Sequence, residues 1–214
     1  IVTGDTKVVQ RGKGDGMFIN TTGIGLVDEA FRPGPRRAAD GDVVLLTGPI
    51  GRHGMTIMSV REGIGFQGAL ESDTANLYPL VQMLRRATDA EVHVLRDPTR
   101  GGVASALNEI AASSAIGIEL DEASLPVPAE VAGACEMLGL DPLYVANEGI
   151  FLAIVPAPTA EAALAALRAH PLGVRACKIG RVTHANEGTV WVRTAIGGTR
   201  VVDMLPGDQL PRMC

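Results

Sequence analysis

Short apolar runs alternate with longer helix-forming stretches along most of this chain, and this alternation limits the folds that are open to it. Runs such as Val43-Val44-Leu45-Leu46 have the length and composition of buried strands, whereas the alanine-rich stretch 160–169 favours helix. The alternation predicts an α/β (α+β) fold, with a mixed sheet covered by helices. We expect strands at 42–47, 92–96, 151–155 and 178–182, a hairpin of 190–193 with 199–202, and helices at 55–62, 74–87, 103–113, 129–138 and 160–169.

The first 37 residues differ from the rest. Two strand-like runs, 1–9 and 16–22, flank a Gly/Lys/Asp-rich turn, and the proline-rich 32–37 predicts a linker. We therefore divide the chain into a strand-rich part of an N-terminal domain (1–37), an α/β domain (38–205) and a tail (206–214). Because Ile1 lies inside a predicted strand and is not a methionine, we interpret the chain as a fragment of a longer protein.

Charge and composition narrow the classes of protein. The net charge of −5 and the pI near 5.4 give no electrostatic reason to expect binding to nucleic acid or an anionic membrane. No apolar run reaches the roughly 18 residues of a membrane span, and no signal peptide is visible. Three cysteines without a C-x-x-C pair argue against a disulfide framework, which predicts a cytoplasmic location.

Two glycine-rich turns, 48–54 and 100–102, each join a predicted strand to a predicted helix. Glycine lets a backbone approach a ligand closely, and the first N–H groups of a helix favour anions such as phosphate. Neither turn matches the P-loop pattern G-x-x-x-x-G-K-[ST]. Each turn therefore fits either a phosphate contact or a plain tight turn.

Three acidic residues are candidates for the chemistry of a site. Asp97 follows a strand beside the second glycine turn, where it can hold Mg²⁺ against phosphates or simply cap a helix or an Asx turn. Asp5 and Lys7 point to the same face of a predicted strand, as metal and phosphate ligands or as a surface ion pair. Glu148 precedes a buried strand, as a general base or a solvated loop acid. His53, Cys135 and Cys177 are interpreted as structural, and no zinc ligand set is present.

Cys214, the last residue of the sequence, follows a stretch with two prolines, a glycine and no periodicity. We expect this tail to be extended and mobile. From Pro206 it could reach on the order of 30 Å, which suits a thiol that visits two sites. The alternative is an accidental terminal cysteine, and a reactive thiolate would need Arg212 or a partner's base nearby.

Taken together and in order, five motifs resemble the HypE family of hydrogenase maturation proteins, which belongs with aminoimidazole ribonucleotide synthetase, selenophosphate synthetase and thiamine monophosphate kinase. The resemblance covers the whole chain, which corresponds to about the last two-thirds of a family member. Arg52 stands where the family usually has Asp, and Met213 where it often has Ile. The motifs are Asp5-Thr6-Lys7-Val8-Val9, Gly48–Gly54, Asp97-Pro98-Thr99-Arg100-Gly101-Gly102, Asn147-Glu148-Gly149 and Pro211-Arg212-Met213-Cys214.

The resemblance implies an ATP-dependent carbamoyl dehydratase. The partner HypF would load a carbamoyl group onto Cys214, and ATP would drive its dehydration to a thiocyanate. The HypC–HypD complex would then receive the cyanide ligand for the iron of [NiFe] hydrogenase. A homodimer is also implied, and residues 1–37 would be the end of an ATP-binding N-terminal domain.

The same resemblance implies roles for individual residues. Glu148 would be the base and Lys7 an assisting cation. Asp5 and Asp97 would hold Mg²⁺. The residues that would bind ATP are Asp5, Thr6, Asp97, Thr99, Arg100, Gly101, Gly102 and Asn147.

Two alternatives stand beside this interpretation. Selenophosphate synthetase is another member of the superfamily, but its reactive Cys or selenocysteine lies near the N-terminus, whereas the distinctive thiol here is terminal. The other alternative is a module without activity of its own that only docks partner proteins.

Overall fold

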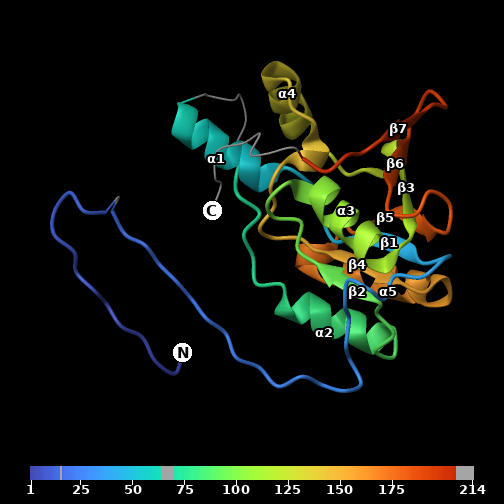
Figure 1. Cartoon of the computed structure of the whole chain (residues 1–214), viewed down its shortest axis with the longest axis horizontal. Helices are drawn as coiled ribbons and strands as arrows, with labels where there is room; N and C mark the ends of the chain where they lie inside the picture. Colours follow the sequence, from blue (N-terminus) through green and yellow to red (C-terminus); the bar gives the residue numbers. More distant parts are fainter. Residues whose placement is uncertain (15, 64–69, 206–214) are drawn as a thin grey trace.

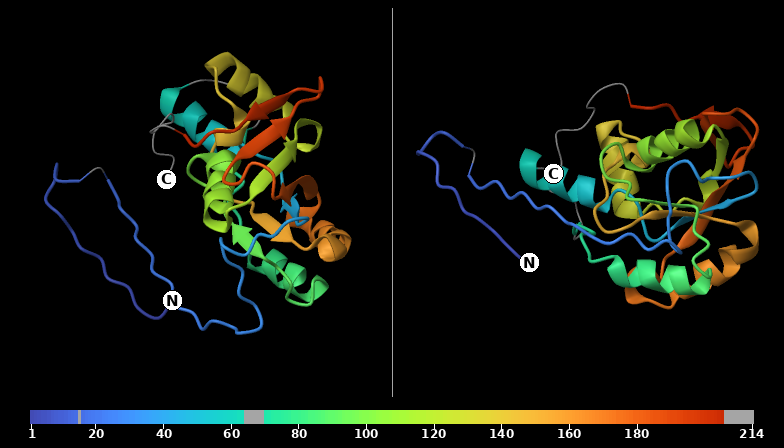
Figure 2. Two further views of the ribbon diagram at one scale, coloured as in Figure 1. Left: turned by 45° about the vertical axis from the view of Figure 1, so that its right-hand side comes forward. Right: turned by 60° about the horizontal axis from the view of Figure 1, so that its bottom comes forward.

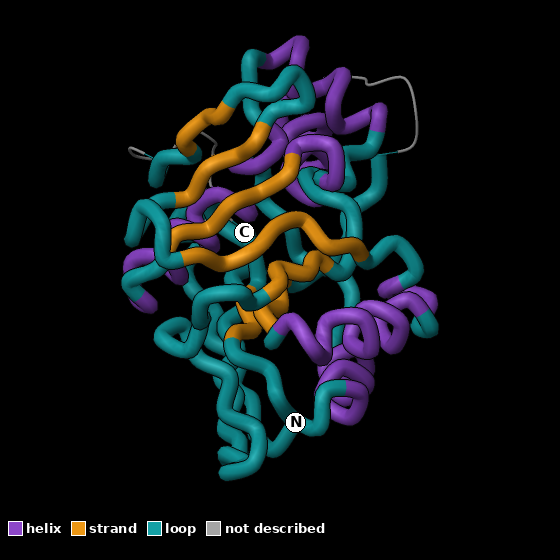
Figure 3. The backbone as a smooth tube through the Cα atoms, turned by 90° about the vertical axis from the view of Figure 1, so that its right-hand side faces the viewer, coloured by secondary structure: helices purple, strands orange, loops and turns teal. Residues whose placement is uncertain are grey.

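A single seven-stranded mixed sheet organises the protein, whose computed structural model describes residues 1–14, 16–63 and 70–205 (Figure 1). The strand order is β2-β4-β1-β5-β3-β6-β7. Every neighbouring pair is antiparallel except β3 and β6, which run parallel. Figure 3 shows the strands of the sheet side by side in orange. The strands are β1 (Val43–Leu46), β2 (Val94–Arg96), β3 (Gly117–Asp121), β4 (Leu152–Val155), β5 (Cys177–Thr183), β6 (Val190–Arg193) and β7 (Thr199–Val201).

Helices cover both faces of the sheet (Figure 2). Alternate residues of β1 show the two sides. Val44 and Leu46 pack in the cluster that contains α3, whereas Leu45 packs with α2 and α5, as the two-residue period of a strand requires. None of the described helices is long and apolar enough to cross a membrane. The helices are α1 (Arg52–Glu62), α2 (Tyr78–Ala87), α3 (Gly102–Ser114), α4 (Ala129–Leu138) and α5 (Ala160–Arg168), with 3₁₀ turns η1 (Glu122–Ser124), η2 (Pro142–Tyr144), η3 (Ala157–Thr159) and η4 (Pro171–Gly173).

A third apolar cluster joins α1 to α4. Met55 of α1 is buried against Val131, Cys135 and the loop residue Val145. Cys135 is only 1% exposed, which confirms its interpretation as a small core residue. This cluster fixes the start of α1 against the segment that leads into β4.

The fold class predicted from the sequence is confirmed, and each strand and helix expected after residue 38 has a counterpart in the structure. The predicted hairpin forms, with Trp191 opposite Val201. β3 was not predicted. Its signal is a short alternation, in which Ile118 and Leu120 are buried and Glu119 faces outward to Arg181.

Two predicted helix starts were wrong. α1 begins at Arg52 rather than at residue 55, because Gly51 takes the left-handed conformation (φ 82°) that lets the helix start there. α2 begins at Tyr78 rather than at residue 74, because Pro79 favours the first turn of a helix. Residues 70–77, before Tyr78, have no regular secondary structure.

The strands predicted at 1–9 and 16–22 do not form in the described residues. This N-terminal segment runs away from the sheet as a long open loop (Figures 1 and 2). Its apolar side chains, such as Val8, Phe18 and Ile19, are exposed. A strand needs a neighbour for its N–H and C=O groups, and an isolated pair of strands is marginal in water. The sequence therefore indicates the strand propensity correctly, but the described chain offers this segment no sheet.

We predict that both described cysteines react slowly with iodoacetamide at pH 8 in the folded protein. Burial raises the pKa of the Cys135 thiol to about 11, and burial also raises the pKa of Cys177, against an opposing effect of Arg168 and Arg175. A raised pKa leaves less of the reactive thiolate. Peptide mapping by mass spectrometry, with and without urea, measures the rates. Equal rates for Cys135 in the folded and unfolded protein would contradict the prediction.

Candidate functional site

The sheet brings three predicted motifs to one edge. β1 and β2 are both antiparallel to β4, which lies between them, so β1 and β2 run in the same direction. Leu46 at the end of β1 and Arg96 at the end of β2 both lie opposite Leu152, the first residue of β4. The turn 48–54, the loop 97–102 and the turn 147–149 therefore meet at the same place.

Asn147 joins these segments through hydrogen bonds. Its side chain is fully buried, and its Oδ1 accepts a hydrogen bond from the Gly51 backbone N–H at 2.7 Å. Its Nδ2 donates to the Pro98 carbonyl at 2.9 Å and to the Val145 carbonyl at 3.0 Å. The Asn147 backbone N–H also donates to Pro98, at 3.2 Å. Asn147 thus fixes the two glycine-rich segments relative to each other, and its side-chain groups are already engaged within the protein.

Both glycine-rich segments end at the start of a helix. Gly51 before α1 and Gly101 before α3 are left-handed, with φ of 82° and 70°. Gly102 is also left-handed, and a Cβ there would lie 2.4 Å from the Leu143 carbonyl oxygen. Neither helix has a side-chain cap or an acidic residue in its first turn. Two helix starts therefore lie at this edge, where the helix dipole favours a phosphate, and the Gly54 and Gly102 N–H groups there already donate to the Ala146 and Thr99 carbonyls.

Charged side chains surround the edge. The Asp97 carboxylate is 60% exposed and lies 3.2 Å from Arg96, which also pairs with Glu109 at 2.9 Å. Asp97 does not cap α3, because the residue at the cap position is Gly101.

The other predicted site residues nearby differ in exposure. Thr99 is half-buried, and its carbonyl accepts a hydrogen bond from the Gly102 N–H at 3.0 Å, whereas the Arg100 side chain is exposed. Glu148 is half-buried, next to Asn147.

The described residues contain no group of three or more His, Cys, Asp or Glu that could hold a metal ion. Mg²⁺ does not require such a group, since it commonly binds one or two carboxylates together with water and substrate phosphates. The exposed Asp97 carboxylate beside two helix starts fits that mode of binding.

The structure does not bring Asp5, Thr6 and Lys7 to this edge. They lie in the open N-terminal segment, are exposed, and make no hydrogen bond or ion pair in the described part of the chain. Their roles remain predictions. Cys214 lies outside the described residues, and so does the rest of the predicted tail, 206–214.

The last described residues are attached beside the second glycine turn. The Tyr144 hydroxyl donates to the Asp203 carbonyl at 2.8 Å, and Asn108 Nδ2 donates to the Val202 carbonyl at 2.8 Å. Burial raises the pKa of Tyr144, which keeps the phenol protonated as a donor. A Cβ at Gly101 would lie 3.4 Å from Leu205 Cδ1. The chain therefore reaches residue 205 next to the start of α3, which the sequence did not reveal.

Two buried side-chain atoms in the described part of the chain lack a hydrogen-bond partner, Arg52 Nε and Asp73 Oδ2. Both belong to this region, because Arg52 begins α1 and Asp73 Oδ1 accepts a hydrogen bond from the Glu148 N–H at 3.1 Å. Buried polar atoms usually find partners, so unpaired ones often mark a functional region. Sequence reasoning did not identify Asp73, since a polar residue between two helices carries no distinctive pattern.

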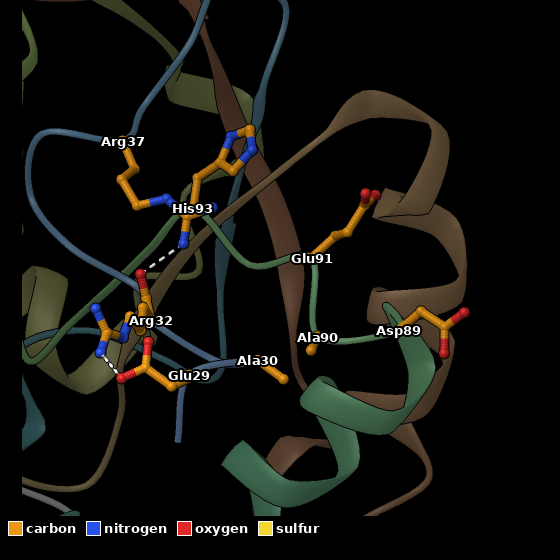
Figure 4. A pocket seen from close by; sticks show the side chains of 8 residues that line it. All are labelled: Glu29, Ala30, Arg32, Arg37, Asp89, Ala90, Glu91 and His93. Atoms are coloured by element: carbon orange, nitrogen blue, oxygen red, sulfur yellow. Dashed lines mark hydrogen bonds and ion pairs between the residues drawn. The ribbon is translucent and has the colours of Figure 1, made fainter. Parts of the chain in front are cut away.

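A hollow of about 440 Å³ lies away from the glycine-rich segments (Figure 4). Its lining includes His93, which precedes β2, whereas Asp97 of the site follows that strand. Its charged groups are largely paired, because Arg32 pairs with Glu29, Arg37 donates to the Arg32 carbonyl, and His93 Nδ1 lies 2.6 Å from Asp42 Oδ2. These contacts leave it less suited to an anionic ligand than the glycine-rich edge.

Comparison with known proteins agrees with this geometry. Residues 39–193 match the family described as AIR synthase related protein, C-terminal domain. The chain belongs to this family. The match starts close to the boundary that the sequence predicted, and it includes the two glycine-rich segments and the Asn147 turn.

The similar proteins bear the name that the motifs indicated. The carbamoyl dehydratase HypE of Cupriavidus necator is 54% identical over 215 aligned residues, which span 100% of this chain and 61% of that protein. A crystal structure of hydrogenase maturation protein HypE in complex with ATP has a TM-score of 0.80 at 46% identity, over 85% of this chain and 55% of that one. A HypE–HypF complex has a TM-score of 0.78 at 41% identity, over 82% and 56%. The resemblance to the HypE family is confirmed.

We predict that Asn147→Ala destabilises the protein strongly. Each buried hydrogen-bonding group that loses its partner costs about 1–3 kcal/mol, and the substitution leaves several such groups unpaired, so the free energy of unfolding should fall by about 3 kcal/mol. Urea unfolding followed by circular dichroism measures the change.

Asn76→Ala is the matched control. Asn76 is exposed and accepts one hydrogen bond, from the Tyr78 N–H at 3.1 Å. Its loss should cost about 1 kcal/mol or less. Equal losses for the two variants would show that Asn147 does not hold the segments together.

Proposed function

We propose that this chain is part of an ATP-dependent carbamoyl dehydratase that serves [NiFe] hydrogenase maturation. The proposal is supported by the 54% identical carbamoyl dehydratase HypE and by the similar HypE structure with ATP. The chain spans 61% of the length of that relative, so the activity belongs to the whole protein. Selenophosphate synthetase is a weaker candidate, because the similar proteins with high identity are HypE proteins.

The observation that carries the proposal is that the tail begins beside the glycine-rich edge. Leu205 packs beside Gly101, at the start of α3. The sequence from Pro206 to Cys214 could reach about 30 Å when extended. The Cys214 thiol is therefore covalently tethered close enough to enter a phosphate site at this edge and to leave it again.

The reaction converts a carbamoyl group on the Cys214 sulfur into a thiocyanate. The amide oxygen attacks the γ-phosphorus of ATP and ADP leaves, which turns a poor leaving group into a good one. The C–O bond then breaks, inorganic phosphate departs, and the amide nitrogen gives up two protons as the C≡N bond forms. Glu148 at the mouth of β4 accepts a proton, and Lys7 assists as a cation.

We assign ATP binding to the edge where the segments 48–54, 97–102 and 147–149 meet. The phosphates lie at the starts of α1 and α3, where the helix dipoles favour negative charge, and they contact Thr99, Arg100, Gly101 and Gly102. Asp97 and Asp5 would hold Mg²⁺, which would offset the negative charge of the phosphates. Asn147 and Thr6 complete the predicted set, and Asn147 does so by fixing the two glycine-rich segments.

The proposed partners follow from the path of the carbamoyl group. HypF loads the group onto Cys214, in line with the similar HypE–HypF complex. The HypC–HypD complex accepts the cyanide. We also propose a homodimer in the cytoplasm, where hydrogenase iron centres are assembled.

We predict that Cys214→Ala in the full-length protein abolishes acceptance of the carbamoyl group. Intact-mass analysis after incubation with a carbamoyl donor system should show the gain of one carbamoyl group, followed by the loss of one water when ATP is added. Cys177→Ser is the control, because this half-buried thiol has a raised pKa and should leave both mass changes intact. The same mass gain in the Cys214→Ala protein would refute the proposal.

We predict that the 214-residue chain alone binds Mg-ATP weakly or not at all. Asp5 and Thr6 lie in an exposed segment without a sheet, so two predicted ATP ligands are not held at the glycine-rich edge. Isothermal titration calorimetry compares this chain with a full-length relative. Tight binding by the chain alone would contradict the prediction, whereas weak binding also fits the alternative that this piece by itself only docks partners.

A further inference from the structure

The segment that precedes α2, residues 71–77, lies against the Asn147–Gly149 turn. Asp73 Oδ1 accepts a hydrogen bond from the Glu148 backbone N–H at 3.1 Å. A Cβ at Gly149 would lie 1.4 Å from the Asp73 carbonyl oxygen, so the two backbones touch and only glycine fits at position 149. This contact joins residues 75 positions apart in the sequence.

The same segment is also attached to the start of α1. Ser72 Oγ lies 2.9 Å from His53 Nδ1 and 2.7 Å from Thr74 Oγ1. The Thr74 N–H donates to Ser72 Oγ at 3.2 Å. Asp73 is therefore held from both sides, by the first glycine-rich segment through Ser72 and by the Glu148 turn through its own carboxylate.

Stability alone does not explain a carboxylate at this position. Asp73 Oδ2 is buried and has no hydrogen-bond partner in the described residues. A buried, unpaired charged oxygen is costly, and an asparagine would accept the same hydrogen bond from Glu148 without a buried charge. What the charge adds is a stronger bond, because a carboxylate accepts a hydrogen bond from a backbone N–H more tightly than a neutral amide does.

We propose that Asp73 is a positioning residue for Glu148, an inference that rests on the proposed dehydratase function. Asn147 holds one end of the turn to Gly51 and Pro98, and Asp73 holds the next peptide group along the chain. Because both peptide groups are fixed, the backbone of Glu148 has a defined position relative to the two glycine-rich segments. Proton transfer needs a base within hydrogen-bond reach of the reacting nitrogen, so this placement affects the chemical step.

The kinetic test compares Asp73→Asn and Asp73→Ala in the full-length protein. Single-turnover dehydration of carbamoylated Cys214 is followed by intact mass over a range of ATP concentrations. A misplacement of about 1 Å can cost about a hundredfold in rate, so we expect the maximal rate to fall about a hundredfold in Asp73→Ala and about tenfold in Asp73→Asn. The ATP concentration that gives half the maximal rate should change less than about threefold, because neither variant touches the phosphate site.

Glu71→Ala is the matched control. Glu71 is an exposed acid in the same segment and makes no hydrogen bond or ion pair in the part of the chain that the structure describes. This variant should dehydrate at the rate of the unsubstituted protein. An unchanged maximal rate in Asp73→Ala, an equal loss in Glu71→Ala, or an effect confined to the ATP dependence would overturn the proposal.

A second measurement does not depend on the dehydratase activity. Hydrogen exchange of the Glu148 amide proton, measured by NMR on the chain itself, reports its bond to Asp73. We expect protection in the unsubstituted chain and in Glu71→Ala, partial protection in Asp73→Asn, and exchange at least about tenfold faster in Asp73→Ala.

The two measurements separate failure of the function from failure of the inference. If the unsubstituted protein does not dehydrate the carbamoyl group, the proposed function fails, while amide exchange still tests the contact. If dehydration proceeds but Glu148 exchanges equally in all variants, Asp73 does not hold the turn. Should Asp73→Ala fail to fold, Asp73→Asn decides, because it keeps the shape and the acceptor oxygen.

Discussion

The candidate site depends on the buried amide of Asn147. Through this side chain, the segment before β4 is hydrogen-bonded to Gly51 after β1 and to Pro98 after β2. The sheet alone brings these three segments to one edge, but strand pairing ends at Leu46, Arg96 and Leu152 and does not determine the path of the residues beyond them. A fully buried amide with three good hydrogen bonds removes that freedom, because any other path would leave buried donors and acceptors unpaired.

Once these segments are fixed, the starts of α1 and α3 lie at the same edge of the sheet. Their left-handed glycines let the chain turn from strand to helix within a few residues, and Gly102 also makes room for the carbonyl groups of η2. η2 contributes in a second way, because Tyr144 at its end holds residue 203. One loop thus shapes the glycine turn and sets where the chain leaves the domain. The tethered thiol and the phosphate site of the proposed reaction therefore depend on the same few packed residues.

Much of this arrangement could be predicted from the sequence, because strand ends and glycine turns are local signals. The strands that end at Leu46 and Arg96 and the strand that begins near Leu152 were predicted, whereas the meeting of their loops at one edge follows from the pairing of β1 and β2 with β4. The attachment of Asp73 to Glu148 could not be predicted, since it depends on a backbone contact at Gly149 between distant segments. The N-terminal strands were wrong for the opposite reason. The apolar residues of 1–9 and 16–22 favour an extended chain, but a strand also requires a neighbour, and the described chain supplies none.

The carboxylates at the site differ in how easily they can change partner. Asp97 is 60% exposed and pairs with Arg96, an interaction that is worth little in water and gives way readily to a cation with phosphates. Asp73 accepts the Glu148 N–H, and its neighbour Ser72 is hydrogen-bonded to His53, so Asp73 cannot exchange its partner without disturbing the backbone. Glu148 is half-buried beside this fixed group. Its side chain can rotate, but its backbone is held in place. The proposed reaction needs nucleotide binding, proton acceptance and release of both products, and the different exposure and hydrogen bonding of these three carboxylates suit those different tasks.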